Sequence, residues 1–210
     1  MSSKPVYIAS SDSAAITRSV EVLERGGVII YPTDTVYGIG ADATNPDAVQ
    51  AVMRIKEREP FKPLVIIVDS MNTAQRYVHL DGLAQTLAER FWPGPLTMQL
   101  HKRNDTLIPP VGDAETVALR VPRNDFCLAL TQALGRPLVS TSVNISGQPQ
   151  AYALRDMLSS LGHNLETVDL VIDAGDLPHS QPSTIITIED GAVRILREGA
   201  VSKATLAEFM

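Results

Sequence analysis

Apolar residues recur at helical spacing in some segments of the chain and in short unbroken runs in others. Between Asp12 and Gly26, Ile16, Val20 and Leu23 fall on one face of a helix that an acidic or hydroxyl side chain can cap and that glycine ends. Short apolar runs bounded by proline or glycine predict buried strands. We expect further helices at 47–57, 81–91, 124–134, 154–161 and near Ala204, and strands at 28–31, 64–68, 96–100, 116–121, 138–141, 170–172, 183–188 and 192–196.

The order of these elements indicates the fold class. Strands and helices alternate over the first part of the chain, and two strands follow one another near its end. This order predicts an α/β or α+β domain whose twisted, mixed parallel and antiparallel sheet is flanked by helices. The sequence has no repeat and no clear linker, so we expect a single domain over residues 1–210.

Composition narrows the class of protein. Of the 210 residues, 44% are hydrophobic and 20% are charged, which excludes a mainly disordered chain. The 18 Lys and Arg residues stand against 24 Asp and Glu, so the net charge is −6. Proteins that grip long nucleic acid through its phosphates are basic as a whole, and this chain is not. Any basic site must therefore be local.

The sequence gives no sign of a disulfide, a protein-bound metal or a membrane anchor. Its single cysteine, Cys127, lies in an apolar stretch, which favours a buried, inert thiol over a nucleophile. The histidines at positions 79, 101, 163 and 179 show no metal-ligand spacing. The first residues do not resemble a signal peptide, and no apolar run approaches the roughly 18 residues that span a bilayer. We therefore expect a cytoplasmic protein.

Hydroxyl-rich segments follow two of the predicted buried strands. The first, 31–38, carries Thr33, Thr35 and Tyr37, and the second, 140–147, holds four hydroxyls, an amide and a glycine. Ligands of open α/β sheets lie beyond the carboxyl ends of strands, where such groups can surround an anion or a nucleotide. The alternative is a pair of turns whose side chains bond to local backbone. The second segment is neither a P-loop nor a dinucleotide-binding fingerprint.

A third polar segment is rich in cations. Lys56 and Arg58 flank the end of a predicted helix, and Lys62 comes just before the next strand, which makes three cations in seven residues. Such a cluster can hold a polyphosphate, because arginine offers a planar fork and lysine a point charge. The alternative is that these side chains interact with the helix dipole and face water.

At these residues the chain resembles the YrdC-like family of threonylcarbamoyl-AMP synthases. Segment 31–38 is similar to the first signature of the family, and Lys56-Glu57-Arg58 to its Lys-x-Arg motif. Five further motifs follow in the order of the family, at 91–97, 118–122, 142–147, 182–184 and 195–199. The resemblance covers about residues 14–200. Because the chain stops soon after the last motif, it resembles the short, single-domain form of the family.

The resemblance implies a fold and a reaction. The fold is a YrdC-like twisted mixed sheet with helices around a concave, positively charged cavity. In the reaction, L-threonine and bicarbonate form N-carboxythreonine, which attacks the α-phosphate of ATP to give threonylcarbamoyl-AMP and pyrophosphate, with Mg²⁺ bridging the phosphates. Partner proteins then transfer the threonylcarbamoyl group to certain transfer RNAs, so this nucleotidyltransferase would contact transfer RNA only weakly or indirectly.

The resemblance also assigns roles to residues. Lys56 and Arg58 would be catalytic and would hold the triphosphate, with Lys62 as a helper. The other ATP-binding residues would be Ser142, Asn144 and Arg197. Threonine would be held by Thr35, Arg120, Thr141 and Ser183, with the fork of the arginine on its carboxylate. We expect no protein ligand dedicated to the metal and name no general base.

Departures from the family pattern are mild. Lys62 stands where a polar residue such as asparagine is common, and Val143 stands where alanine is common. Two other functions compete with the synthase. One is a non-catalytic RNA-binding module that uses the same cavity, which the acidic composition disfavours. The other is an adenylating enzyme that uses carbamoyl phosphate, as in hydrogenase maturation, which a chain with one cysteine disfavours because those proteins are cysteine-rich.

Overall fold

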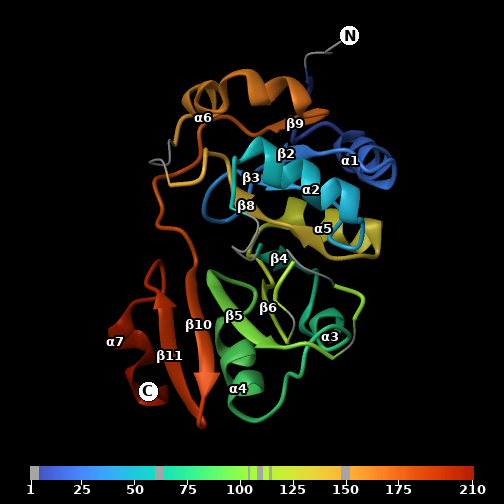
Figure 1. Ribbon diagram of the computed structural model, residues 1–210. Helices are drawn as coiled ribbons and strands as arrows, with labels where there is room; N and C mark the ends of the chain where they lie inside the picture. The colour runs from blue at the N-terminus through green and yellow to red at the C-terminus, as the bar shows by residue number, and fades with distance from the viewer. Residues whose placement is uncertain (1–4, 60–63, 104, 108–110, 114, 148–151) are drawn as a thin grey trace.

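The computed structural model describes residues 5–59, 64–103, 105–107, 111–113, 115–147 and 152–210, and its strands form two mixed sheets (Figure 1). The first sheet has the strand order β1-β9-β2-β3-β8, with β1 Val6–Ala9, β9 Leu170–Asp173, β2 Ile29–Tyr31, β3 Gly38–Gly40 and β8 Thr141–Ser142. The second has the order β11-β10-β5-β6-β4-β7, with β11 Ala192–Arg197, β10 Thr184–Glu189, β5 Leu96–His101, β6 Thr116–Arg120, β4 Ile66–Ile67 and β7 Leu138–Val139.

Each sheet combines parallel and antiparallel pairs. In the first sheet β9 runs parallel to both β1 and β2, while β3 is antiparallel to its neighbours β2 and β8. In the second sheet β10 is parallel to β5 and β4 is parallel to β6, and the remaining pairs are antiparallel. The expected mixed sheet is thus present, but the chain divides it into two.

The chain passes from one sheet to the other at a single residue. Ser140 separates β7 of the second sheet from β8 of the first, and its backbone N–H donates to the carbonyl oxygen of Val65 at 2.8 Å. Next to it, the N–H of Val139 donates to the carbonyl oxygen of Ala41 at 2.8 Å. The chain also crosses between β3 and β4, and again between β9 and β10, where Figure 1 shows one extended connection. Ser140 and the end of the β9–β10 segment border the space between the sheets.

Helices cover the sheets where the apolar spacing places them. They are α1 Ala15–Glu24, α2 Pro46–Ile55, α3 Met71–Ala74, α4 Gly82–Phe91, α5 Asp125–Leu134, α6 Leu154–Ser160 and α7 Lys203–Leu206, with 3-10 turns η1 Gly162–Thr167 and η2 Ala207–Phe209. Side-chain oxygens of Asn45 and Asn124 cap α2 and α5, and Gly135 ends α5 in the left-handed conformation at φ 67°. Local chemistry therefore fixes these helix ends.

One large apolar cluster joins the two sheets. It contains Ile30 and Ile39 of the first sheet together with Ile66, Met98 and Leu119 of the second, all of them fully buried. A smaller cluster lies between α1, α5 and the first sheet and includes the thiol of Cys127, which is buried as expected. Burial of apolar surface of this extent is the main stabilising contribution to such a fold. It fixes both sheets as walls for the space between them.

Most of the elements expected from the sequence are confirmed, and the exceptions have physical reasons. The expected strand 64–68 is reduced to Ile66–Ile67, the two residues in register with β6 and β7. The expected strand 138–141 is divided at Ser140 into β7 and β8, and the sequence analysis missed β1, β3 and α3. Strand β3 has a glycine at each end because the ring of Tyr31 packs there: a Cβ on Gly40 would lie 2.5 Å from the ring. No helix in the described residues is long and apolar enough to cross a membrane.

Candidate active site

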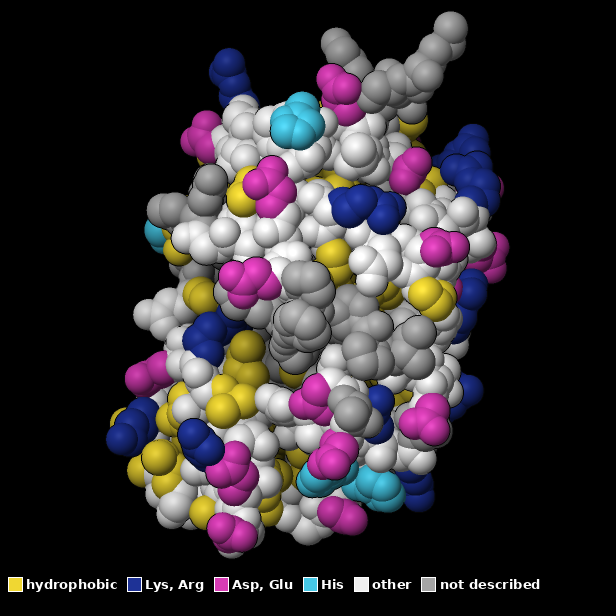
Figure 2. Space-filling model, viewed as in Figure 1, with side chains coloured by type: hydrophobic (Ala, Val, Ile, Leu, Met, Phe, Trp, Pro, Cys, Tyr) yellow, Lys and Arg dark blue, Asp and Glu magenta, His cyan; other side chains and the backbone are white. Residues whose placement is uncertain are grey.

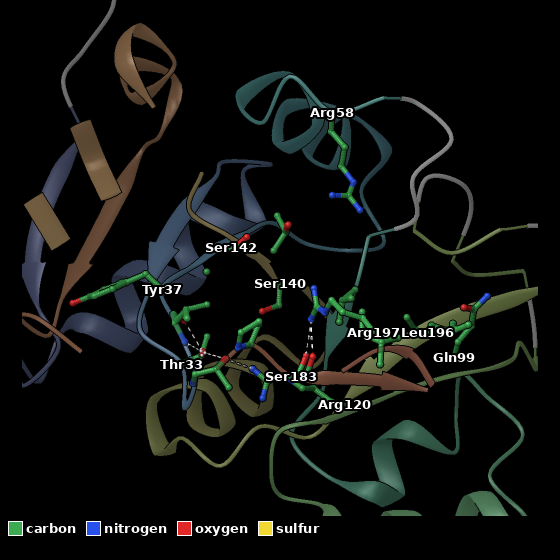
Figure 3. Close-up of a pocket in the computed structure, with 18 residues that line it drawn as sticks. Thr33, Tyr37, Arg58, Gln99, Arg120, Ser140, Ser142, Ser183, Leu196 and Arg197 are labelled. Atoms are coloured by element: carbon green, nitrogen blue, oxygen red, sulfur yellow. Dashed lines mark hydrogen bonds between the residues drawn. The ribbon is translucent and has the colours of Figure 1, made fainter. Parts of the chain in front are cut away.

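A cavity of about 350 Å³ lies between the two sheets (Figure 3). This volume is within the roughly 300–1,000 Å³ of small-molecule sites. Its walls come from the β2–β3 loop, from β5, β6, β8, β10 and β11, and from the turn after α2. The lining residues are Thr33, Thr35, Val36, Tyr37, Gly38, Arg58, Val65, Gln99, Ala118, Arg120, Ser140, Thr141, Ser142, Pro182, Ser183, Ile185, Leu196 and Arg197.

The β2–β3 loop is shaped by Thr33. Its Oγ1 accepts the backbone N–H groups of Thr35 and Val36, both at 3.1 Å, and donates to the carbonyl oxygen of Val36 at 2.6 Å. The Oγ1 atoms of Thr33 and Thr35 are 3.1 Å apart, within hydrogen-bond distance of each other. The Thr35 hydroxyl lines the cavity, where it can donate to a ligand or accept from one.

Ser183 can donate a hydrogen bond into the cavity. Its Oγ accepts from the hydroxyl of Thr97 at 2.9 Å and from Nη2 of Arg197 at 3.4 Å. Arg197 also donates to the Ser183 carbonyl oxygen at 2.7 Å, which places the end of β11 against the start of β10 (Figure 3). Since both bonds to Oγ are accepted, the Ser183 hydrogen remains to be donated into the cavity.

Arg120 lies at the end of β6 and is almost fully buried. Its Nη1 forms an ion pair with Asp34 Oδ1 at 2.8 Å, and its Nη2 donates to Thr35 Oγ1 at 3.3 Å. The two side chains of the ion pair are 4% and 9% exposed. A charge-assisted bond of this kind, out of water, holds the guanidinium in one orientation beside the β2–β3 loop.

The end of α2 directs two neighbouring cations to different places. The N–H of Glu57 donates to the carbonyl oxygen of Arg54, and that of Arg58 to the carbonyl oxygen of Met53, which is the Schellman pattern of a helix end. Glu57 takes the left-handed conformation at φ 49°. The turn carries Lys56 inward and leaves Arg58 at the cavity wall (Figure 3).

Lys56 is a buried anchor of the segment that carries Ser142 and Asn144. The residue is 2% exposed, and its Nζ donates to the carbonyl oxygen of Ser142 at 2.5 Å, to that of Asn144 at 2.8 Å and to Asn144 Oδ1 at 3.2 Å. The Ser142 hydroxyl donates to the same Oδ1 at 2.6 Å. The N–H of Ser146 donates to the Lys56 carbonyl oxygen at 2.9 Å. The ammonium thus ties the loop to α2.

Burial and mutual repulsion act on the cations of the site. Burial, and then the charge of Arg58, lowers the pKa of Lys56 to about 7. Partial removal from water lowers the pKa of Arg58, and the same cause followed by the charges of Arg120 and Arg58 lowers that of Arg197. Cations that depress one another's pKa gain from an anion placed among them. No carboxylate is among the described residues that line the cavity.

Seven of the ten residues proposed from the sequence line this one cavity: Thr35, Arg58, Arg120, Thr141, Ser142, Ser183 and Arg197. Lys56 and Asn144 lie behind the wall and support it, and Lys62 lies outside the described residues. The sequence analysis missed Gln99, whose Nε2 donates to Thr116 Oγ1 at 2.7 Å, and Asp34. In the sequence, Gln99 stands out as a polar residue within an apolar strand, and Asp34 as a carboxylate between two threonines. These two features could have marked them as candidates. The ligand contacts of all these residues stay predictions.

Comparison with known proteins places the chain in a family. Residues 21–199 match the model of the Sua5, YciO and YrdC family, whose description is telomere recombination. The chain belongs to this family. A relative from Methanocaldococcus jannaschii, whose name assigns it to the threonylcarbamoyl-AMP synthases, is 38% identical over 183 residues, which are 87% of this chain and 84% of the relative. The threonylcarbamoyl-AMP synthase of Bacillus subtilis is 33% identical over 92% of this chain, but only 56% of its own length is covered.

Solved structures of family members share the fold. Sua5 of Pyrococcus abyssi in complex with L-threonine superposes with a TM-score of 0.88 at 27% sequence identity, over 99% of this chain and 61% of that protein. YciO of E. coli superposes with a TM-score of 0.81 at 26% identity, over 99% of this chain and 98% of its own. The mixed α/β architecture expected from the sequence is therefore that of the family.

Proposed function

We propose that this protein is an L-threonylcarbamoyladenylate synthase, which makes threonylcarbamoyl-AMP and pyrophosphate from L-threonine, bicarbonate and ATP. Threonine and bicarbonate condense to N-carboxythreonine with loss of water. A carboxylate oxygen of this carbamate attacks the α-phosphorus of ATP and forms a new P–O bond. The bond from the α-phosphorus to the bridging oxygen breaks, and pyrophosphate leaves with its electron pair.

The observation that carries the proposal is the polarity of the cavity wall. Arg58, Arg120, Arg197 and the Ser183 hydroxyl are donors, and the Thr35 hydroxyl can accept within the same space. An amino acid has a carboxylate for the donors and an ammonium or amine for the acceptor. Its carbamate and the triphosphate of ATP are both anions, so the arginines can hold them together and stabilise charge as the phosphoryl group is attacked.

Within this proposal the residues divide into two groups. Thr35, Arg120, Thr141 and Ser183 bind threonine, and Arg58, Ser142 and Arg197 bind the nucleotide. Lys56 and Asn144 contribute to nucleotide binding through the loop that they hold in place. Lys62 remains a proposed helper. The name of the Pyrococcus abyssi structure states that L-threonine is bound there, which supports threonine as the amino acid.

The residues of the cavity fit a Mg²⁺ ion that enters with the nucleotide. Among the described residues no group of three or more His, Cys, Asp or Glu side chains could hold a metal ion. Mg²⁺ in nucleotide sites is commonly held by phosphate oxygens and water with few protein ligands, and the cavity offers hydroxyls to such waters. The ion would reduce the negative charge of the triphosphate during attack.

The RNA-binding alternative is not favoured. In Figure 2 the Lys and Arg side chains on the face shown are dispersed among Asp and Glu side chains and form no continuous basic surface. A long nucleic acid needs many such contacts, whereas a small anion needs only a local cluster. We propose that the product passes to proteins that modify transfer RNA, and that the protein acts in the cytoplasm.

The test is the release of pyrophosphate from ATP, measured with and without threonine and bicarbonate. We expect release to require both, and Arg58→Ala to lower kcat/KM at least about 100-fold, as the loss of a charge-stabilising donor does. Arg54→Ala is the matched control, because Arg54 lies exposed on the same helix end and does not line the cavity. Full turnover by folded Arg58→Ala, or release that is independent of threonine, would contradict the proposal.

A further inference from the structure

Asp34 contacts Arg120 from outside the cavity. Its Oδ1 accepts from Nη1 of Arg120 at 2.8 Å, and its Oδ2 accepts the backbone N–H of Arg123 at 3.1 Å. Arg123 in turn donates from Nε to the carbonyl oxygen of Pro93 at 3.1 Å. Asp34 itself is not among the residues that line the cavity, whereas Arg120 is. The carboxylate is therefore fixed behind the wall that the guanidinium forms.

The remaining contacts of Arg120 show which of its donors a ligand can use. Nη1 donates to Asp34 and, at 3.5 Å, to the carbonyl oxygen of Gly94, and one hydrogen of Nη2 goes to Thr35. For the Nε hydrogen and the second Nη2 hydrogen, the described part of the chain provides no acceptor. In a planar guanidinium, Nε–H and one hydrogen of Nη2 lie on the same edge, in the spacing that accepts the two oxygens of a carboxylate.

The charge of Asp34 and its position have opposite effects on the binding of an anion by Arg120. As a neighbouring negative charge, Asp34 weakens the attraction between Arg120 and an anion. As a fixed acceptor, it immobilises a long side chain before the substrate arrives, so that less conformational entropy is lost on binding. Removing it leaves Nη1 with only the 3.5 Å contact to Gly94, so the guanidinium is free to turn its other edge to the cavity. When the substrate carboxylate makes two hydrogen bonds to the guanidinium, we expect the fixed orientation of Arg120 to affect binding more than the charge of Asp34 does.

We propose that Asp34 is a positioning residue for amino-acid recognition: it holds Arg120 so that its Nε–Nη2 edge receives the substrate carboxylate. The substrate class rests on the proposed function, and the orientation of Arg120 does not.

The test compares Asp34→Asn with Asp42→Asn. Asparagine keeps the size of Asp34 but has one oxygen for the two donors, Nη1 of Arg120 and the N–H of Arg123. Asp42 is the matched control, since it is 2% exposed and pairs with Arg136 at 2.7 Å, yet neither residue lines the cavity. By calorimetric titration with L-threonine, we expect Asp34→Asn to bind about 10- to 100-fold more weakly, as for loss of a hydrogen bond to a charged group, and Asp42→Asn to bind as the wild type does.

Two further measurements show whether weaker threonine binding by Asp34→Asn results from poorer recognition of the carboxylate. The wild type is expected to prefer L-threonine over L-threoninamide, which lacks the carboxylate, and Asp34→Asn to lose most of that preference while its KM for ATP stays unchanged. A merely structural defect would raise both KM values together. Tighter or unchanged threonine binding by Asp34→Asn would overturn the proposal, because the charge of Asp34 would then outweigh its geometry or have no effect.

The orientation of Arg120 is tested without any substrate. In ¹⁵N NMR spectra of arginine side chains, assigned with Arg120→Lys, we expect separate, slowly exchanging Nη signals of Arg120 in the wild type and averaged signals in Asp34→Asn. If the wild type binds no threonine but shows this difference, the proposed function fails and the positioning role stands. If the Arg120 signals are the same in both proteins, the positioning role fails whatever the substrate is.

Discussion

The ammonium nitrogen of Lys56 lies 2.8 Å from the carbonyl oxygen of Asn144, a residue 88 positions further along the chain. Two more oxygens, the carbonyl of Ser142 and the Asn144 side chain, accept from the same nitrogen. This contact joins the end of α2 to the segment after β8, and it makes the Lys-x-Arg and Ser-x-Asn motifs one structural unit. Lys56 lies beneath this unit and Arg58 at its surface.

Lys56→Met should weaken both stability and turnover. The substitution keeps an apolar stem of similar length but leaves buried oxygens without their donor, at a cost of about 1–3 kcal/mol for such a group. At roughly 2–4 °C per kcal/mol for a chain of this size, Tm should fall by several degrees in a thermal melt. Lys102→Met, which also removes a lysine that donates to a carbonyl oxygen, that of Leu107 at 3.1 Å, should leave turnover unchanged. Loss of turnover in both variants would contradict a specific role of Lys56.

Lys56 should also make stability depend on pH. Its pKa is about 7 in the folded chain against an ordinary value of 10.5, so between these pH values the unfolded chain binds more protons at this site. The contribution of Lys56 to the free energy of unfolding therefore rises with pH over this window, by up to about 1.4 kcal/mol per pH unit. Denaturant unfolding of the wild type and Lys56→Met at pH 6 to 10 measures this slope, which should be absent in Lys56→Met and should disappear in the wild type below pH 7.

Turnover should change with pH in the opposite direction. A neutral Lys56 keeps two N–H donors for three oxygens, so the loop is held less firmly above pH 7. We expect kcat/KM for ATP to fall through one ionisation near pH 7 in the wild type. The residual activity of Lys56→Met should lack this step. An identical profile in both proteins would assign the ionisation to another group.

Thr35→Val should raise the KM for threonine, and Thr35→Ser should restore it. The Thr35 hydroxyl lines the cavity and can accept from the ligand, which valine of equal shape cannot. Loss of a bond to a charged donor predicts roughly a 10-fold higher KM, with little change in the KM for ATP. Steady-state kinetics at saturating ATP measures this. Thr167→Val, at an exposed threonine outside the cavity, is the control, and a valine variant with normal KM would show that Thr35 contacts no ligand.

Gly199→Ala should disturb the Ser183 wall of the cavity. A Cβ on Gly199 would lie 2.1 Å from the carbonyl oxygen of Pro182 and 2.8 Å from the carbonyl carbon of Ser183, and backbone atoms cannot move aside cheaply. We expect a loss of about 1–3 kcal/mol in the free energy of unfolding, as for overpacking, together with a higher KM for threonine. Ala200→Ser at the neighbouring exposed position should change neither, and equal effects of the two substitutions would exclude the steric explanation.

The sequence predicted most regular elements because their causes are local. Apolar spacing located α1, α2, α4 and α5, and short, mostly apolar segments located β2, β5 and β6. It missed β1, whose residues are mostly exposed at a sheet edge, and β3, whose glycines carry no apolar pattern. Both strands exist because neighbouring strands pair with them, β9 with β1 and β8 with β3. Such pairing depends on residues far away in the chain.

The candidate site likewise has features that could be read from the sequence and features that depend on distant contacts. By itself the sequence determined which residue types are present: hydroxyls after buried strands, cations after a helix, and motifs in the order of a known family. Only the tertiary structure decided that Lys56 is buried under the loop, that Asp34 faces Arg120, and that the Ser183 hydroxyl accepts from Thr97. These properties follow from contacts between segments more than 80 residues apart and from the water that those contacts exclude. Residue order along the chain does not encode them directly, because hydrogen-bond partners and burial are set by packing.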